Sequence, residues 1–292
     1  MSKWPTQRVC EVADGIFTVV HGQGEVGVAN ASFVIEQGRT LVIDTMTFPA
    51  MAVNMAEEIA RHGGCVDVVL NTHHHIDHMG GNAVFADSGP IFAHPASIGA
   101  AQKLGLPVPV YHRLMPRFQE HFADLELVLP APLPAHLPLP RDGELLAFAP
   151  AHTPADVAVW FPCARVLIAG DICFNGVVPL AVNSLISGWL AALDALIALE
   201  PEVVVPGHGA IGSLRDLLIL REYFTALARL GHRAVQEELT LRDALALFDP
   251  GPLAEWIEGE RHAINLERVL QEARGEISAA DLSLLPLSAH RR

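Results

Sequence analysis

The chain has 292 residues, of which 51% are hydrophobic and only 18% charged, a composition that excludes a disordered chain and predicts a large buried core. Its 33 acidic and 19 basic residues give a net charge of −14, which repels phosphate backbones, so we expect no nucleic-acid partner. No apolar run is long enough to cross a bilayer, and the N-terminus lacks the apolar core of a signal peptide. We therefore expect a cytoplasmic protein without a membrane partner.

The first part of the chain alternates between short β-branched runs and one stretch of helical spacing. The predicted elements are antiparallel strands at 16–20, 31–36 and 40–44, a helix at 50–61 and a buried strand at 66–70. The last of these strands runs directly into a cluster of histidines. A strand that ends in a polar loop is where α/β proteins place their chemistry.

The proline-rich segment 104–140 predicts an irregular excursion over the surface, long enough to serve a function. Beyond it the pattern of strands and helices resumes. The predicted elements are strands at 144–148, 157–161, 166–169 and 202–205, a helix at 188–199 and a turn at 206–209. The two halves together predict a sandwich of two mixed sheets flanked by helices. From Ser213 the pattern is helical almost to the end, with a break at 249–252.

The segment 71–78, with the letters NTHHHIDH, concentrates side chains of the types that bind metals. Residues two apart in an extended loop point the same way, so His73 and His75 can bind one ion, while Asp77 and His78 turn toward a second. By the same alternation His74 is expected to point away from both. Imidazole and carboxylate ligands suit zinc, iron or manganese.

The pattern His-x-His-x-Asp-His at 73–78 resembles the signature of the metallo-β-lactamase superfamily of metal-dependent hydrolases. Further motifs of the family follow in the correct order: Asp44 in LVIDT, His152 in AHTP, Asp171 in AGD and His208 in PGHG. The resemblance implies an α/β fold, a four-layer αβ/βα sandwich, with the catalytic domain over 1–212. It also implies that 213–292 forms a helical C-terminal extension packed on the same domain.

The resemblance further implies a dinuclear metal centre. One ion would be held by His73, His75 and His152 and the other by Asp77, His78 and His208, with Asp171 and a hydroxide bridging them. The expected cofactors are two divalent ions, Zn²⁺ in the first place, with Fe or Mn as alternatives. Asp77 and Asp171 are the expected catalytic carboxylates, whereas Asp44 is expected to support the metal loop from behind. A water held by such ions ionises near neutral pH and needs no separate base.

This reading predicts an enzyme that hydrolyses an ester-like bond, a thioester, lactone or carboxylic ester, of a small-molecule substrate. Zinc β-lactamases of the best-known subclass place Cys at the position of Asp171, which weakens β-lactam hydrolysis as an alternative. Flavin-linked diiron relatives place Glu at the position of His75, which weakens an iron-dependent oxygenase or redox protein. Both alternatives stay open, and the complete ligand set argues against a non-enzymatic relative.

Three further residues are candidates for substrate binding: Asn175, Tyr111 and Arg113. Tyr111 and Arg113 lie in the segment 104–140, and an arginine there can bind a substrate carboxylate with two hydrogen bonds. Asn175 follows Asp171 closely and either binds substrate or shapes the turn. The oligomeric state stays open, with a homodimer among the assemblies allowed.

Overall fold

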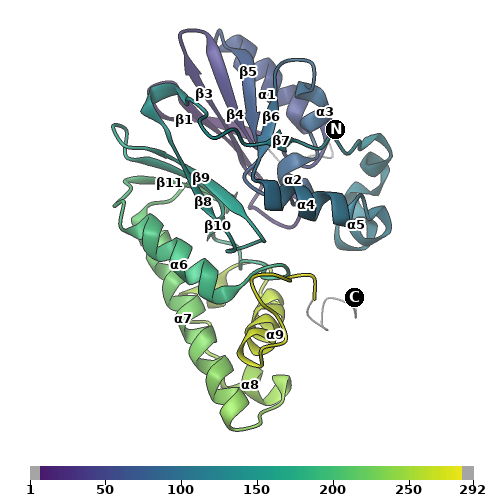
Figure 1. Ribbon diagram of the computed structural model, residues 1–292, viewed down its shortest axis with the longest axis vertical. Helices are drawn as coiled ribbons and strands as arrows, with labels where there is room; N and C mark the ends of the chain where they lie inside the picture. The colour runs from purple at the N-terminus through teal and green to yellow at the C-terminus, as the bar shows by residue number, and fades with distance from the viewer. Residues whose placement is uncertain (1–6, 285–292) are drawn as a thin grey trace.

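The computed structural model describes residues 7–284 as two mixed β-sheets that face each other and carry helices on both outer sides (Figure 1). Three clusters of buried apolar side chains fill the three interfaces between these four layers. Alternation along the strands builds them: Phe17 and Phe33 face the helices, while their neighbours Ile16 and Val34 face the second sheet. The predicted four-layer sandwich is thereby confirmed.

The first sheet has seven strands in sequence order: β1 Gln7–Ala13, β2 Ile16–His21, β3 Ala31–Glu36, β4 Arg39–Ile43, β5 Cys65–Leu70, β6 Ile91–Ala93 and β7 Ala131–Pro132. Strands β1 to β4 pair antiparallel and β4 to β7 pair parallel. The strands predicted at 16–20, 31–36, 40–44 and 66–70 are confirmed. The sequence does not predict β1, which lies at the edge of the sheet.

The helices beside this sheet are α1 Pro49–Arg61, α2 Ile76–Met79, α3 Asn82–Phe85, α4 Pro95–Leu104 and α5 Val108–Leu114, followed by the 3₁₀ helix η1 Pro116–Asp124. The prediction of an irregular excursion at 104–140 is therefore wrong in its first part. Prolines lie in the first turns of α5 and η1, where a missing N–H costs no hydrogen bond. Tyr111, Phe118 and Phe122 are buried in the core beside the first sheet.

The second sheet has the strand order β11 Val203–Gly209, β10 Val166–Asn175, β9 Asp156–Phe161 and β8 Glu144–Phe148. The 3₁₀ helix η2 Pro140–Asp142 leads into β8. β10 extends well beyond the predicted 166–169, and β11 continues through the turn predicted at 206–209. The reason is parallel pairing between the two strands, which resumes after a bulge and places Phe174 opposite His208. Both strands therefore reach the loops that carry the histidines.

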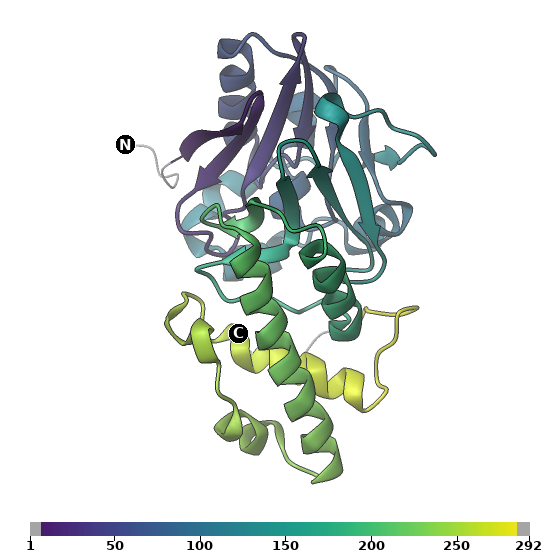
Figure 2. The same ribbon diagram turned by 90° about the vertical axis from the view of Figure 1, so that its left-hand side faces the viewer.

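The outer helices of the second sheet are α6 Ile186–Ile197, α7 Leu214–Gln236, α8 Leu241–Leu247 and α9 Arg261–Ala273, with the 3₁₀ helix η3 Gly251–Glu255 before α9. α7 begins as predicted, because the side chain of Ser213 and that of Asp216 cap its first turn reciprocally. Figure 2 shows α9 crossing α7, and both helices share one apolar cluster with β10. A domain boundary between 212 and 213 stays a prediction. Within residues 7–284 no helix is long and apolar enough to cross a membrane.

Candidate metal centre

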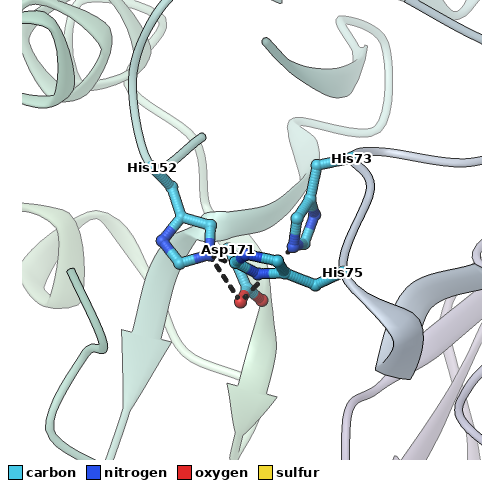
Figure 3. A group of neighbouring side chains, drawn as sticks. All are labelled: His73, His75, His152 and Asp171. Carbon is cyan, nitrogen blue, oxygen red and sulfur yellow. Dashed lines mark hydrogen bonds and ion pairs between the residues drawn. The ribbon is translucent and has the colours of Figure 1, made fainter. Parts of the chain in front are cut away.

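The side chains predicted as ligands come together where β5, β10 and β11 end. His73 and His75 follow β5, Asp77 and His78 lie in α2, His152 lies between β8 and β9, Asp171 lies in β10 and His208 in β11. They form two groups, His73, His75, His152 and Asp171 in one and Asp77, His78 and His208 in the other, whose ligand atoms lie within 4.8 Å of one another in each group. Figure 3 shows the three imidazoles of the first group pointing toward the Asp171 carboxylate.

Asp171 lies between the two groups. Its Oδ2 lies 3.2 Å from Nε2 of His152 and 3.8 Å from Nε2 of His73, in the first group. Its Oδ1 lies 3.1 Å from Nε2 of His78, and its Oδ2 lies 3.6 Å from Nε2 of His208, in the second group. One carboxylate thus faces nitrogen atoms of both groups, as a bridging ligand would.

The distances between ligand atoms fit bound metal ions. A tetrahedral ion with bonds of about 2.0 to 2.1 Å separates its ligands by about 3.3 to 3.4 Å. Nδ1 of His75 and Nε2 of His152 are 3.1 Å apart, and Nε2 of His208 lies 3.2 Å from Oδ2 of Asp77. Nε2 of His73 is buried without a hydrogen-bond partner. Buried polar atoms need a partner, and a cation held by the first group would supply one for this nitrogen.

Asp44 orients two of the histidines from behind. Its Oδ2 accepts a hydrogen bond from Nδ1 of His78 at 2.7 Å and another from Oγ1 of Thr72 at 2.8 Å. Because the Thr72 hydroxyl donates its proton to Asp44, its oxygen can accept a hydrogen bond from Nδ1 of His73, which lies 3.0 Å away. Both imidazoles are thus protonated on the outer nitrogen and present Nε2 inward. This is the position that the resemblance implies for Asp44.

His208 is oriented by a backbone carbonyl. Its Nδ1 donates to the oxygen of Gly24 at 2.9 Å, which leaves Nε2 for the second group. Gly24 has φ +82°, and a Cβ there would lie 2.2 Å from a backbone nitrogen of β11, so the close approach requires glycine. A Cβ at Gly207 would lie 1.8 Å from Oδ1 of Asp171, so glycine is required there to leave room for the carboxylate.

His75 has a partner that the sequence does not predict. Its Nε2 lies 3.2 Å from Oδ1 of Asn183, and an amide oxygen can only accept, so His75 carries its proton on Nε2 and keeps Nδ1 free. Asn183 is 108 residues away in the chain. His74 is buried and belongs to neither group; its ring packs 4.7 Å from that of His75.

The protonation states suit a metal site. Burial lowers the pKa of His73 well below its ordinary value and that of His75 to about 4, so both imidazoles are neutral at pH 7, the form that binds metals. Burial opposes ionisation of Asp77 and Asp171. A hydrogen bond from His208 at Asp77, and the charges of His78 and His208 at Asp171, outweigh it and hold both pKa values below the ordinary range. Both carboxylates therefore stay charged.

The three candidates for substrate binding differ in their surroundings. Tyr111 is buried in α5; burial and the charge of Asp77 raise its pKa, so its hydroxyl remains a donor at neutral pH. Arg113 is exposed on the same helix. Nδ2 of Asn175 donates to the carbonyl of Ala210 at 3.0 Å, a contact that ties the end of β10 to the residue after β11.

A surface depression of about 610 Å³ lies beside the loop that contacts His208. It is lined by Gly22, Gln23, Glu25, Arg117, Ile257, Glu258 and Glu260. Arg117 comes from η1 and the last three residues lie between η3 and α9, so the segment 104–140 and the connection between these two C-terminal helices both contribute to it. Behind it lies the buried Arg261, which pairs with Glu258 at 3.4 Å and experiences the charges of Asp77 and Asp171. The sequence does not predict a role for Arg261.

Comparison with known proteins agrees with this geometry. The family model of the metallo-beta-lactamase superfamily matches residues 24–208, well over half of the chain. The chain therefore belongs to the metallo-beta-lactamase superfamily, most of whose members are metal-dependent hydrolases.

Solved metallo-beta-lactamases share the fold at low sequence identity. DIM-1 superposes with a TM-score of 0.61 at 20% identity, over 76% of this chain and 98% of its own. The enzyme from Pontibacter korlensis gives 0.61 at 18%, over 75% and 99%. FIM-1 from Pseudomonas aeruginosa gives 0.60 at 15%, over 77% and 97%.

A curated relative is the alpha subunit of 2,4-dinitroanisole O-demethylase from Nocardioides sp. (strain JS1661). It is 26% identical over 213 residues, which make up 69% of this chain. The chain spans 55% of that relative's length.

Proposed function

We propose that the chain is a metal-dependent hydrolase that cleaves an ester-like bond, a thioester, lactone or carboxylic ester, of a small molecule. The observation that carries the proposal is the position of Asp171 between two groups of ligand-type side chains. Each group offers at least two imidazoles and shares this carboxylate, an arrangement suited to two divalent ions close together. Zinc is the ion that imidazole and carboxylate ligands favour in a hydrolase.

Two divalent ions held there would lower the pKa of a bound water from 15.7 toward about 7 and polarise a substrate oxygen. The protein's own contribution is to hold the ligands. Asp44 and the Gly24 carbonyl keep three histidines in one tautomer, so no ligand has to reorient when substrate arrives. The Tyr111 hydroxyl, which burial and the charge of Asp77 keep protonated, is the donor that we assign to a substrate oxygen.

We take the bond class from the protons that the two groups could donate once metal ions are bound. Asp171 and Asp44 raise the pKa of His78 against the effect of burial, but its Nε2 would have to lose its proton to bind an ion, and its Nδ1 proton is held by Asp44. His73 and His75 are neutral at pH 7, and the two carboxylates are ionised. Substrates whose leaving group departs without full protonation are therefore favoured, such as thiolates, phenolates and ring-opened lactones. Unactivated peptides fit poorly.

A second candidate is hydrolysis of an activated aryl methyl ether, because a relative is named as a 2,4-dinitroanisole O-demethylase subunit. Its nitro-substituted phenolate would also leave without protonation. β-Lactam hydrolysis has only the shared fold in its favour, since the three β-lactamase structures compared above are 15 to 20% identical. A redox reaction would require iron.

The test is a substrate panel with zinc-loaded and iron-loaded protein. It contains thioesters, lactones, aryl esters, penicillins and 2,4-dinitroanisole, and Asp171→Asn serves as the matched inactive variant. We expect thioester or lactone kcat/KM to exceed that for β-lactams more than tenfold, about 1.4 kcal/mol of transition-state stabilisation. A preference for penicillins, or oxygen consumption by the iron form, would overturn the proposal. Preference for the ether would select the second candidate.

A further inference from the structure

The segment 176–187, called the flanking segment below, comprises the connection after β10 and the first two residues of α6, and it borders the metal centre. Oδ1 of its Asn183 lies 3.2 Å from Nε2 of His75. Two residues further on, the backbone N–H of Leu185 donates at 3.1 Å to the carbonyl of Ala151, which directly precedes a histidine of the first group. The position of the flanking segment therefore bears on the orientation of two ligand-type histidines.

On its other side the flanking segment is held by polar side chains from α9. Residues 261, 265, 268 and 272 are spaced four, three and four apart, so they project from one face of the helix. Three of these side chains donate to backbone carbonyls of the flanking segment, each at 2.8 Å: Arg261 Nη1 to Val178, Asn265 Nδ2 to Pro179 and Arg268 Nε to Ser184. Two side-chain oxygens accept from its backbone N–H groups: Asn265 Oδ1 from Ala181 at 2.9 Å and Glu272 Oε2 from Ile186 at 2.7 Å.

These contacts are deeply buried. Arg261 is 4% exposed, and Asn265 and Arg268 are fully buried. Arginine and asparagine are rarely buried unless they are paired, and all three are paired with the backbone of the same segment. α9 lies outside residues 24–208, which match the family model, so this way of holding the segment belongs to the C-terminal helices of the chain.

We propose that α9 is a positioning element of the metal centre. By holding the flanking segment it places Asn183 where the amide oxygen accepts the Nε2 proton of His75, which leaves Nδ1 for the metal. Asn183 is thus a positioning residue, because it acts through His75. The inference rests on the proposed metal centre but not on the identity of the substrate.

The first test titrates metal-stripped full-length protein with zinc alone, in competition with a chromophoric chelator. Asn183→Ala should weaken zinc binding 10- to 100-fold, the usual effect of losing an outer partner of a metal ligand. Asn183→Asp keeps an acceptor and should stay near wild type. The ¹⁵N spectrum of the His75 imidazole should lose its Nε2-protonated form in the alanine variant only. Wild-type zinc affinity in Asn183→Ala would overturn the inference.

The second test asks whether α9 acts through Asn183. Glu272→Ala removes the acceptor for the N–H groups of Ile186 and Ser187 at the end of the contact row where the side chain is only partly buried. It should weaken zinc binding, yet add nothing in the Asn183→Ala background. Glu276→Ala, exposed just beyond α9, is the matched control and should bind as wild type.

Wild-type zinc affinity in Glu272→Ala would show that α9 has no positioning role. An effect that adds fully to that of Asn183→Ala would show that α9 does not act through Asn183, which would also overturn the inference. Both tests use zinc binding without any substrate. A failed substrate panel therefore leaves this inference standing, and a failed zinc test leaves the ester-like substrate class untouched.

Discussion

Oδ2 of Asp44 accepts a hydrogen bond from Nδ1 of His78 at 2.7 Å, and the same oxygen accepts from the hydroxyl of Thr72 at 2.8 Å. Oδ1 of Asp44 accepts a further hydrogen bond from the Thr72 backbone N–H at 2.7 Å. One buried carboxylate therefore fixes both the loop that carries the first histidines and the ring that faces Asp171. A single residue outside the ligand set thus links the two groups.

Asp44→Asn tests this link. Asn tolerates the positive φ of 63° at this position, so the backbone need not change. Its NH₂ group accepts no hydrogen bond, so either the Thr72 backbone N–H or the pair of donors His78 Nδ1 and Thr72 Oγ1 loses its acceptor. We expect zinc affinity to fall by about 10- to 100-fold. Asp67, which is partly exposed and pairs with Arg39 at the surface, gives the matched control Asp67→Asn. Equal zinc affinity in both variants would contradict the role of Asp44.

The number of ions is predicted from the two groups of ligand atoms. Purified protein should carry close to two metal ions per chain, because seven ligand-type side chains exceed what one tetrahedral ion can use. His75→Ala should lose metal, whereas His74→Ala should retain it, because His74 belongs to neither group. Elemental analysis measures both. One ion in fully loaded protein, or equal loss in the two variants, would show that the ligands are wrongly assigned.

Gly207→Ala should disrupt the centre without touching a ligand. Its Cβ would lie 1.8 Å from Oδ1 of Asp171, so the carboxylate must move away from both groups. We expect metal content to fall toward that of Asp171→Ala. Gly99→Ala is the control, because a Cβ there meets nothing within 4 Å and alanine favours the helix that contains it. Unchanged metal content in Gly207→Ala would contradict the close packing described here.

Because His21 is buried, we expect the free energy of unfolding to depend on pH. Burial lowers its pKa from 6.5 to about 4. Between these values the unfolded chain binds a proton that the folded chain does not, so stability falls as the pH drops from 6.5 to 4, by up to about 3 kcal/mol.

Urea unfolding of metal-free protein at several pH values measures this effect. His21→Gln should reduce the slope over that window and leave the part that comes from His73, His74 and His75, whose pKa values burial also lowers. His136→Gln, at an exposed position, should leave the slope unchanged. A slope as steep in His21→Gln as in the wild-type protein would contradict the role of His21.

Tyr111→Phe should lower kcat more than it raises KM, because it removes a donor while the ring keeps its place against Phe122. Steady-state kinetics on the best substrate of the panel decide it. The outcome that contradicts the assignment is an unchanged kcat with intact folding, checked by circular dichroism.

Local patterns were enough to predict most strands and the side chains that come together at the candidate metal centre. The alternation at 16–20 and 31–36 reflects a sheet with two buried faces, and the spacing at 73–78 reflects an extended loop followed by a bend. These features depend on neighbours a few residues away, which a sequence shows directly. The segment 104–140 was predicted wrongly in part, because its many prolines suggest irregular structure. Proline also fits the first turn of a helix, as it does in α5 and η1.

Only the tertiary structure decided which groups form hydrogen bonds to the candidate ligands and orient them. Asn183 reaches His75 across 108 residues, and the carbonyl of Gly24 reaches His208 across 184. No spacing rule links residues so far apart, and a sequence does not show which backbone carbonyl will contact a given side chain. The long β11 is likewise a consequence of pairing with β10, since the PGHG letters by themselves favour a turn. Strand pairing and helix packing bring such groups together, and they form only once the whole chain has folded.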